Sequence, residues 1–218
     1  MASIKVIAQL EKLLVRMPSR WDGRKAILEM RDAEYAHWKQ MEWIGFYFQF
    51  LCDTKLVPLV KIPGPKYGRV EFDGFLEIPW DFKVHPNKNA KGHENKYVIV
   101  NDRLAILRAI KEFGAAGLVL AIGDAEYNDE NRSFQIWHKE LKGGLSKYEK
   151  QRILRKAPSR LRKTAFRLRE IRLILLDDKK VRGLGLFQGG FRNSDGRPRK
   201  AKVLLNLDKV TAVKTIRF

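Results

Sequence analysis

Hydrophobic positions in the first quarter of the chain recur at helical spacing. They predict a short amphipathic helix over residues 4–15, which ends before the segment MPSRWDG. A second, long helix is predicted from residue 22 or 24 to about residue 54. The next segment, LVPLVKIPGPKYG, is interrupted by Pro and Gly and has strand character over 56–62. The N-terminal part is therefore expected to be mainly helical.

The middle of the chain has the pattern of strands. Residues 70–85, VEFDGFLEIPWDFKVH, read as a β-hairpin. A helical pattern over 103–113 stops at Gly114, and AGLVLAIGDAEY at 116–127 reads as a buried parallel strand. A crossover helix and a parallel strand after an antiparallel hairpin predict an α/β (mixed α+β) fold, with a central mixed β-sheet flanked by helices.

The C-terminal third combines basic residues with hydrophobic ones. Residues 147–172 hold eleven Lys and Arg against two Glu, and their pattern is helical with a break at Pro158. The segments IRLILL and KVLLNL read as strands that flank the loop GGFRNSDGRPR at 189–199. This part of the chain therefore offers a basic surface and a polar loop.

The charge of the whole chain indicates what kind of partner it has. The 44 Lys and Arg against 25 Asp and Glu give a formal net charge of +19 and a pI near 10.1. With 44% hydrophobic residues the chain can build a core, so the imbalance points to an anionic partner, nucleic acid above all. A highly charged, solvated surface is the alternative interpretation.

Several classes of protein are excluded by the same sequence. The single cysteine, Cys52, rules out an internal disulfide framework and a cysteine-based zinc site. The longest apolar stretch, 43–52, is too short to cross a bilayer, and the N-terminus carries Glu11 without a signal-peptide cleavage site. We therefore expect a cytoplasmic protein with no membrane association.

The hairpin carries charges within an otherwise buried pattern. If it is symmetric about Glu77, Asp73 stands opposite Asp81, and alternation puts Lys83 on the same face as Asp81. Two carboxylates at such a short distance repel each other unless a cation lies between them. Mg²⁺ accepts one or two protein carboxylates as ligands. A lysine beside that ion can orient an attacking water. The alternative is a salt-bridged hairpin, with Lys83 paired to Glu71 and Asp73 capping a turn.

A further acid precedes the hairpin in the sequence. Glu42 lies in HWKQMEWIGFYFQFL, a segment predicted to be a helix that is apolar on nearly every side. A carboxylate among aromatic side chains is costly unless it reaches a partner. Glu42 is therefore a candidate for a third acid of the hairpin site, and a pairing with a core Arg or Lys is the alternative.

The order of these residues and elements along the chain resembles the motif of the PD-(D/E)XK nuclease superfamily. Among its members, the chain is most similar to the type II restriction endonucleases. The resemblance covers about 32–124 and assigns Asp73 as the first acid, Asp81 and Lys83 as the DFK triplet, and Glu42 as the accessory helix acid. It implies an αβββαβ restriction-endonuclease-like core, a Mg²⁺ cofactor held by Asp73, Asp81 and Glu42, and sequence-specific cleavage of double-stranded DNA.

The pattern also departs from that superfamily in two ways. Phe72 rather than Pro precedes Asp73, and the gap between Asp73 and Asp81 is short, so Glu71 or Glu77 remains an alternative first ligand. Under this interpretation the chain is a single nuclease domain over 1–218. Its basic helical and β-hairpin part, about 145–218, would recognise the DNA.

Two groups of side chains are candidates for DNA contact. The basic region would neutralise phosphates, and the loop near 189–199 has side chains suited to reading base edges. The phosphate candidates are Arg160, Arg162, Lys163, Arg167 and Arg169; the base-reading candidates are Gln188, Arg192, Asn193, Asp195, Arg197 and Arg199. A plain Asp-Gly hairpin turn is the alternative for this loop.

Other metal sites are weaker candidates. Asp124, Glu126 and Asp129 follow the predicted parallel strand and are second-choice metal ligands, with a solvated loop as the alternative. His85 and His93, in a polar segment, faintly suggest a different class of nuclease metal site.

The leading functional hypothesis is a Mg²⁺-dependent type II restriction endonuclease that acts as a homodimer, because one active site must cut two strands and symmetric DNA sites favour two-fold dimers. A structure-specific repair or junction nuclease and a non-enzymatic DNA- or RNA-binding protein are the alternatives.

Overall fold

The computed structural model describes residues 2–188, 190 and 197–218. Its helices are α1 (Ile4–Leu14), α2 (Gly23–Asp32), α3 (Trp43–Leu56), α4 (Arg103–Phe113), α5 (Ser133–Leu141), α6 (Lys147–Leu154) and α7 (Asp178–Arg182). Its strands are β1 (Arg20–Asp22), β2 (Lys66–Tyr67), β3 (Val70–Glu71), β4 (Gly74–Leu76), β5 (Ile78–Pro86), β6 (Tyr97–Asp102), β7 (Ala116–Glu126), β8 (Ala165–Leu176), β9 (Gly185–Phe187), β10 (Lys202–Asn206) and β11 (Lys214–Arg217).

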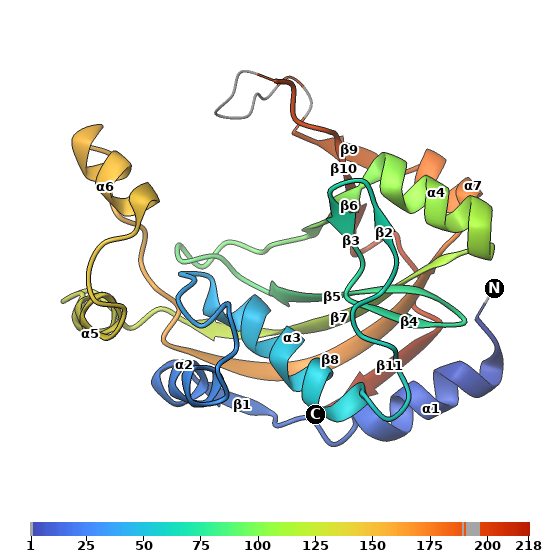
Figure 1. Cartoon of the computed structure of the whole chain (residues 1–218), viewed down its shortest axis with the longest axis horizontal. Helices are drawn as coiled ribbons and strands as arrows, with labels where there is room; N and C mark the ends of the chain where they lie inside the picture. The colour runs from blue at the N-terminus through green and yellow to red at the C-terminus, as the bar shows by residue number, and fades with distance from the viewer. Residues whose placement is uncertain (1, 189, 191–196) are drawn as a thin grey trace.

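The central sheet contains six strands. They follow the order β1-β8-β7-β5-β4, and β11 also pairs with β8 (Figure 1). β5 and β7 run parallel, whereas β4 with β5 and β7 with β8 are antiparallel. A smaller sheet has the order β6-β10-β9, and β2 pairs with β3. The predicted fold class, a mixed sheet flanked by helices, is confirmed.

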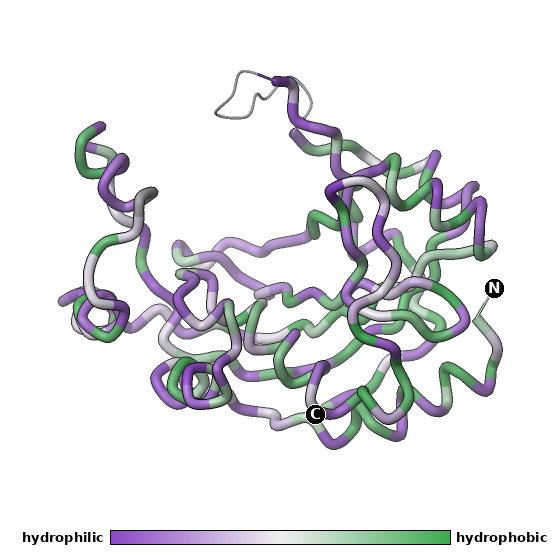
Figure 2. Tube along the Cα trace, in the orientation of Figure 1, coloured by the Kyte–Doolittle hydropathy of each residue, from purple (hydrophilic) through white to green (hydrophobic). Residues whose placement is uncertain are grey.

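Hydrophobic side chains are buried on both faces of the central sheet. Successive residues of β7 point to opposite faces: Val119 and Ala121 belong to one core, and Leu118 and Leu120 to the other. Helices α1, α2 and α3 cover the first core, while α4, α7 and the small sheet cover the second (Figure 1). In Figure 2 the hydrophobic positions gather on the central strands, and the loop from β5 to β6 is mostly hydrophilic.

The parallel pairing of β5 with β7 runs from Trp80 opposite Gly117 to Pro86 opposite Gly123. A Cβ atom at Gly117 would lie 2.2 Å from the Trp80 ring, so only glycine leaves room for the indole there. The pairing places Asp81, the next residue of β5, opposite Leu118 of β7.

The order hairpin, crossover helix, parallel strand is confirmed. α4 has the predicted bounds and ends at Gly114, whose φ of 78° is the left-handed conformation that glycine adopts readily. The hairpin pairs Gly74 with Trp80 and Leu76 with Ile78, which is the register predicted from symmetry about Glu77. The hairpin register and the bounds of α4 are therefore those predicted from the sequence.

The predicted long helix over 22–54 is wrong, because the structure has two helices there. α2 ends at Asp32, and Glu34 has a φ of 54°, outside the helical region. The backbone N–H of Tyr35 donates to the carbonyl of Met30, which satisfies a helix-end carbonyl. α3 then begins at Trp43, so hydrophobic periodicity continues across a break in the backbone.

The helical interpretation of 147–172 holds only for α6. Residues 165–176 form β8, which pairs with β7, β1 and β11 in the central sheet. Apolar and basic residues alternate along FRLREIRL, but the pairing with β7 shifts register between Ile122 and Gly123. That bulge interrupts the period of two, which is why the sequence pattern of this strand resembles that of a helix. No helix among the described residues has the length and apolarity needed to cross a membrane.

Candidate active site at the β4–β5 hairpin

The hairpin brings the three predicted site residues together. Lys83 Nζ lies 3.7 Å from Asp73 Oδ2 and 3.9 Å from Asp81 Oδ1. Asp73 immediately precedes β4, and its Oδ2 accepts a hydrogen bond from the backbone N–H of Phe82, the residue after Asp81. The alternative ion pair of Lys83 with Glu71 is not observed: Lys83 lies beside Asp73 and Asp81, whereas Glu71 is exposed in β3, which pairs with β2.

Asp73 is held in a fixed orientation by two hydrogen bonds. The backbone N–H of Phe82 donates to Oδ2 at 2.6 Å, and the side-chain amide of Gln49 donates to Oδ1 at 2.8 Å. Gln49 belongs to α3, so a helix far away in the sequence supports the hairpin acid. The sequence interpretation missed Gln49; its only signal was a lone amide in a hydrophobic helix.

Asp81 is almost completely buried, with 1% of its surface exposed. Oδ1 accepts a hydrogen bond from Asn101 at 3.3 Å, and Oδ2 is buried with no hydrogen-bond partner among the described residues. Burial raises the pKa of this carboxyl to about 6, although Lys83 acts in the opposite direction. A buried carboxylate oxygen without a partner is costly, so it is an acceptor available to a cation or a proton donor.

Lys83 is a cation in this site. Burial by itself would lower its pKa, but the carboxylates of Asp81 and Asp73 outweigh burial and hold the pKa above its usual value. About 29% of its side chain is exposed, so it faces solvent while Asp81 lies behind it. Lys83 can therefore donate hydrogen bonds to an anion or water that approaches the hairpin.

Two further charged groups lie around the site. Asp53, one turn after Gln49 on α3, has a pKa raised to about 6, first by burial and also by the charge of Asp73. On the other side, Lys202 of β10 lies 3.5 Å from Asp102 and lowers the pKa of Asp81 through its charge. Neither was identified from the sequence, because both come from elements distant along the chain.

Asp73 and Asp81 are the residues of the hairpin that could hold a divalent cation. Among the described residues, no group of three or more His, Cys, Asp or Glu side chains is arranged to hold a metal ion. Two carboxylates suffice for Mg²⁺, however, since it keeps several waters and takes substrate phosphate oxygens as ligands. Oδ2 of Asp81, for which the described part of the chain offers no hydrogen-bond partner, and the adjacent carboxylate of Asp73 fit that requirement.

Glu42 does not lie where the sequence predicted. It precedes α3 instead of lying within a helix, its side chain is 64% exposed, and it forms an ion pair with Lys163. Its pairing with a lysine is the alternative that the sequence left open. Glu77 is also unavailable as a first ligand, because it is in the hairpin turn and accepts hydrogen bonds from the backbone and hydroxyl of Ser3.

The second-choice metal ligands already have partners. Asp124 pairs with Arg169 at 2.6 Å, and Glu126 pairs with Arg20 at 3.3 Å. Asp129 accepts a hydrogen bond from the backbone N–H of Phe134 at the start of α5. These contacts explain the three acids as parts of the structure.

The two histidines of the weaker nuclease pattern differ in environment. The ring of His85 is buried, and its Nε2 lies 2.6 Å from the carbonyl oxygen of Asn95. His93 is exposed on the loop between β5 and β6. A buried histidine bonded to the backbone is structural, so these residues do not form a second candidate site.

The predicted phosphate-contacting residues differ in accessibility. Arg160 and Arg167 are exposed, and Arg169 is about half exposed while paired with Asp124. Lys163 is mostly buried beside Glu42, and Arg162 is buried beside Glu149. Arg162 therefore belongs to a buried ion-pair network, and contact of the basic region with phosphates stays a prediction.

The predicted base-reading residues are only partly covered by the structure. Gln188 is half-buried directly after β9, with a φ of 68°, and Arg197 and Arg199 are exposed before β10. Arg192, Asn193 and Asp195 lie outside the described residues. Comparison of the chain with protein-family models, curated proteins and solved structures finds no match.

Proposed function

We propose that this protein is a Mg²⁺-dependent endonuclease that hydrolyses phosphodiester bonds in double-stranded DNA, as type II restriction endonucleases do. The observation that carries the proposal is the convergence of Asp73, Asp81 and Lys83, in which one buried oxygen of Asp81 has no hydrogen-bond partner among the described residues. Two carboxylates and a partly exposed lysine in a strongly basic protein suit an anionic substrate and a cation.

The proposed roles follow from the contacts. Asp73 and Asp81 would hold Mg²⁺, which supplies positive charge that polarises the scissile phosphate. Gln49 and the backbone N–H of Phe82 keep Asp73 oriented, as outer hydrogen-bond partners do at metal sites. Asn101 does the same for Asp81.

Lys83 acts in this proposal as a hydrogen-bond donor. Its raised pKa keeps it protonated at neutral pH, so it cannot accept the proton of the attacking water. It can orient that water and offset the negative charge that develops on the phosphoryl oxygens as the new P–O bond forms and the bond to the leaving sugar oxygen breaks. Proton transfer is left to solvent.

Recognition of DNA is assigned to exposed basic side chains. Arg160 and Arg167 are exposed, and Arg197 and Arg199 precede β10 beside the candidate base-reading loop. Such residues would neutralise backbone phosphates and make binding strongly dependent on salt. We also propose a homodimer, because cleavage of both strands at a symmetric site needs two active sites related by a two-fold axis.

The proposal is tested by digesting a long, fully sequenced plasmid with and without Mg²⁺ and sequencing the fragment ends. We expect discrete Mg²⁺-dependent fragments, loss of at least about 10³-fold in rate for Asp81→Asn and Lys83→Gln, and full activity for the control Asp208→Asn, an exposed acid on the loop after β10. Circular dichroism of each variant checks that the fold is retained.

The other outcomes each identify a different function. A common palindromic end sequence would support a restriction enzyme, whereas cleavage only of branched DNA would favour a structure-specific nuclease. An intact plasmid in Mg²⁺ and in Mn²⁺, together with tight, salt-sensitive binding, would overturn the catalytic proposal and favour a non-enzymatic binding protein.

A further inference from the structure

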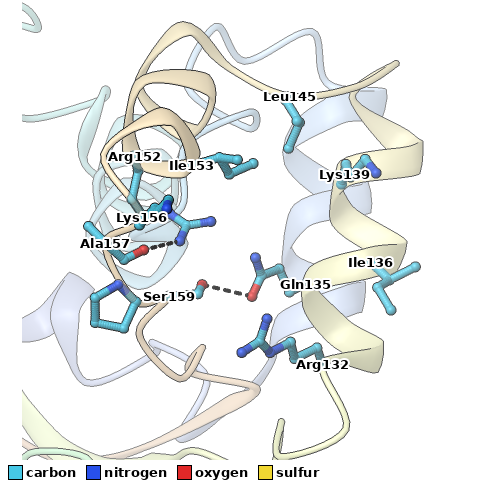
Figure 3. Close-up of a pocket in the computed structure, with 11 residues that line it drawn as sticks. Arg132, Gln135, Ile136, Lys139, Leu145, Arg152, Ile153, Lys156, Ala157 and Ser159 are labelled. Carbon is cyan, nitrogen blue, oxygen red and sulfur yellow. Dashed lines mark hydrogen bonds between the residues drawn. The ribbon is translucent and has the colours of Figure 1, made fainter.

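A basic pocket lies between α5 and α6, away from the hairpin acids. It has a volume of about 550 Å³, and Figure 3 shows side chains of the two helices and the following segment around it. Among the described residues that line it, Arg132, Lys139, Arg152 and Lys156 are cations, and none is Asp or Glu. The pocket therefore has a one-sided positive charge.

Among the described residues, no acid forms an ion pair with Arg132, Lys139, Arg152 or Lys156. The buried carboxylate of α6, Glu149, is occupied by Lys142 at 3.3 Å and Arg162 at 3.8 Å. Arg152 donates from Nη1 to the carbonyl of Ala157 at 2.7 Å, and its Nε is buried without a hydrogen-bond partner among the described residues. An anion in the pocket would supply the charge and the acceptors that the protein itself does not.

The position of the pocket relates it to the hairpin site. α5 and α6 are inserted between β7 and β8, beyond the carboxyl ends of the parallel strands β5 and β7, and α6 projects from the body of the protein (Figure 1). β7 ends at Glu126, about eight residues past Leu118, the partner of Asp81, and α5 and α6 follow that end. Eight residues of a strand span about 26 Å, so the pocket is separated from the hairpin acids by several base pairs of duplex DNA at about 3.4 Å each.

We infer that the pocket between α5 and α6 binds the phosphodiester backbone of duplex DNA several base pairs to one side of the bond that is cut. This inference rests on the proposed function, because it takes DNA as the substrate. Each strand of duplex DNA carries one phosphate for about every 3.4 Å along the helix axis, so one strand can present several charges to the cations of a single pocket. Half-exposed Ile136 and Ile153 would contact the sugars between those phosphates.

The decisive variant removes three cations without disturbing the fold. Arg132→Asn, Lys139→Gln and Lys156→Asn are combined; Arg152 is kept because it holds the Ala157 carbonyl. Arg132 and Lys156 have positive φ, which Asn tolerates well. The matched control combines Lys5→Gln, Lys12→Gln and Arg16→Gln on and just after α1, three exposed cations whose removal changes the net charge equally.

Binding is measured first, with a 30-base-pair duplex in EDTA over a range of salt concentrations. If all three cations contact phosphates, the slope of log K against log salt falls by about 2 to 3, and affinity at moderate salt falls by about 10- to 100-fold. The control should keep the slope of the wild type. Equal slopes for the two triple variants would overturn the inference.

Cleavage then tests the position of the contact. On duplexes that extend about fifteen base pairs beyond the mapped cut, the pocket variant should cut more slowly than the control. On duplexes that extend about five base pairs, which do not reach the pocket, the two should cut alike. A defect that is equal on both lengths would overturn the inference.

The measurements separate this inference from the proposed function. If the wild type binds DNA but never cuts it, the nuclease proposal fails, and the salt slope still decides the pocket. If the wild type cuts and the pocket variant binds and cuts like the control, only the pocket inference fails. Unchanged DNA affinity with loss of poly-glutamate binding would overturn it in favour of an acidic protein partner.

Discussion

Gln49 of α3 donates a 2.8 Å hydrogen bond to Oδ1 of Asp73, the residue that precedes β4. This contact joins a helix to a hairpin acid 24 positions away in the sequence. Because the other oxygen of Asp73 accepts from the backbone N–H of Phe82, both oxygens of the carboxylate have fixed donors. The orientation of Asp73 toward Lys83 therefore depends on the packing of α3 against the hairpin.

Replacing Gln49 by Leu should weaken the site without unfolding it. The variant keeps the volume of the side chain but removes the donor to Asp73, so we expect the Mg²⁺ concentration for half-maximal cleavage to rise by about 10- to 100-fold. Cleavage rates measured over a Mg²⁺ titration check this. Gln40→Leu, at an exposed position before α3, is the control and should leave the titration unchanged.

Asp81 should make the stability of the protein depend on pH. Its pKa is raised to about 6 in the folded state, so the folded protein binds more protons than the unfolded chain between pH 4 and 6. The free energy of unfolding should therefore fall as pH rises through this range, by about 1 to 3 kcal/mol relative to Asp81→Asn. Chemical denaturation in EDTA from pH 4 to 8 measures the difference, and parallel pH curves for the two proteins would contradict it.

Asp53, but not Glu42, should affect the pH dependence of cleavage. Asp53, with a pKa raised to about 6 near Asp73, adds negative charge at the site as pH rises, so the rate should increase between about pH 5 and 7. Asp53→Asn should make that increase less steep. Glu42→Gln should leave the profile unchanged, because Glu42 is exposed and its ion pair is with Lys163. An altered profile for Glu42→Gln alone would restore the role that the sequence predicted.

Glu149 should contribute to the stability of the region around α6. Burial would raise its pKa, but hydrogen bonds from Ser146 and the charge of Lys142 outweigh burial and lower it. Its stabilising effect is therefore present above its unfolded pKa and lost as the pH falls below about 4. Glu149→Gln leaves Lys142 and Arg162 without a buried counter-charge, so we expect a loss of about 2 to 4 kcal/mol at pH 7.

Two measurements check this prediction. Chemical denaturation at pH 7 gives the change in the free energy of unfolding. Hydrogen exchange of Glu149→Gln, compared with the wild type, should be accelerated more in α6 than in the central strands. Glu140→Gln, an exposed acid on α5, is the control for loss of one negative charge. A loss of protection spread evenly over the whole chain would contradict a local role.

The hairpin, the crossover helix and the parallel strand could all be predicted from the sequence. Their patterns depend on near neighbours: alternation along 70–85, the helix stop at Gly114, and the continuous apolar run of β7. The juxtaposition of Asp73, Asp81 and Lys83 also followed from local register, because the three residues lie within eleven positions of one hairpin.

The side chains that surround those acids, in contrast, depend on the tertiary structure. Gln49, Asn101 and Lys202 reach the site from three other elements, and no spacing along the chain links them to Asp81. The same limit explains the errors: Glu42 pairs with a lysine 121 positions away, and a bulge hides the strand period of β8. Local pattern fixes which way neighbouring side chains point, whereas contacts between distant segments depend on how the whole core packs.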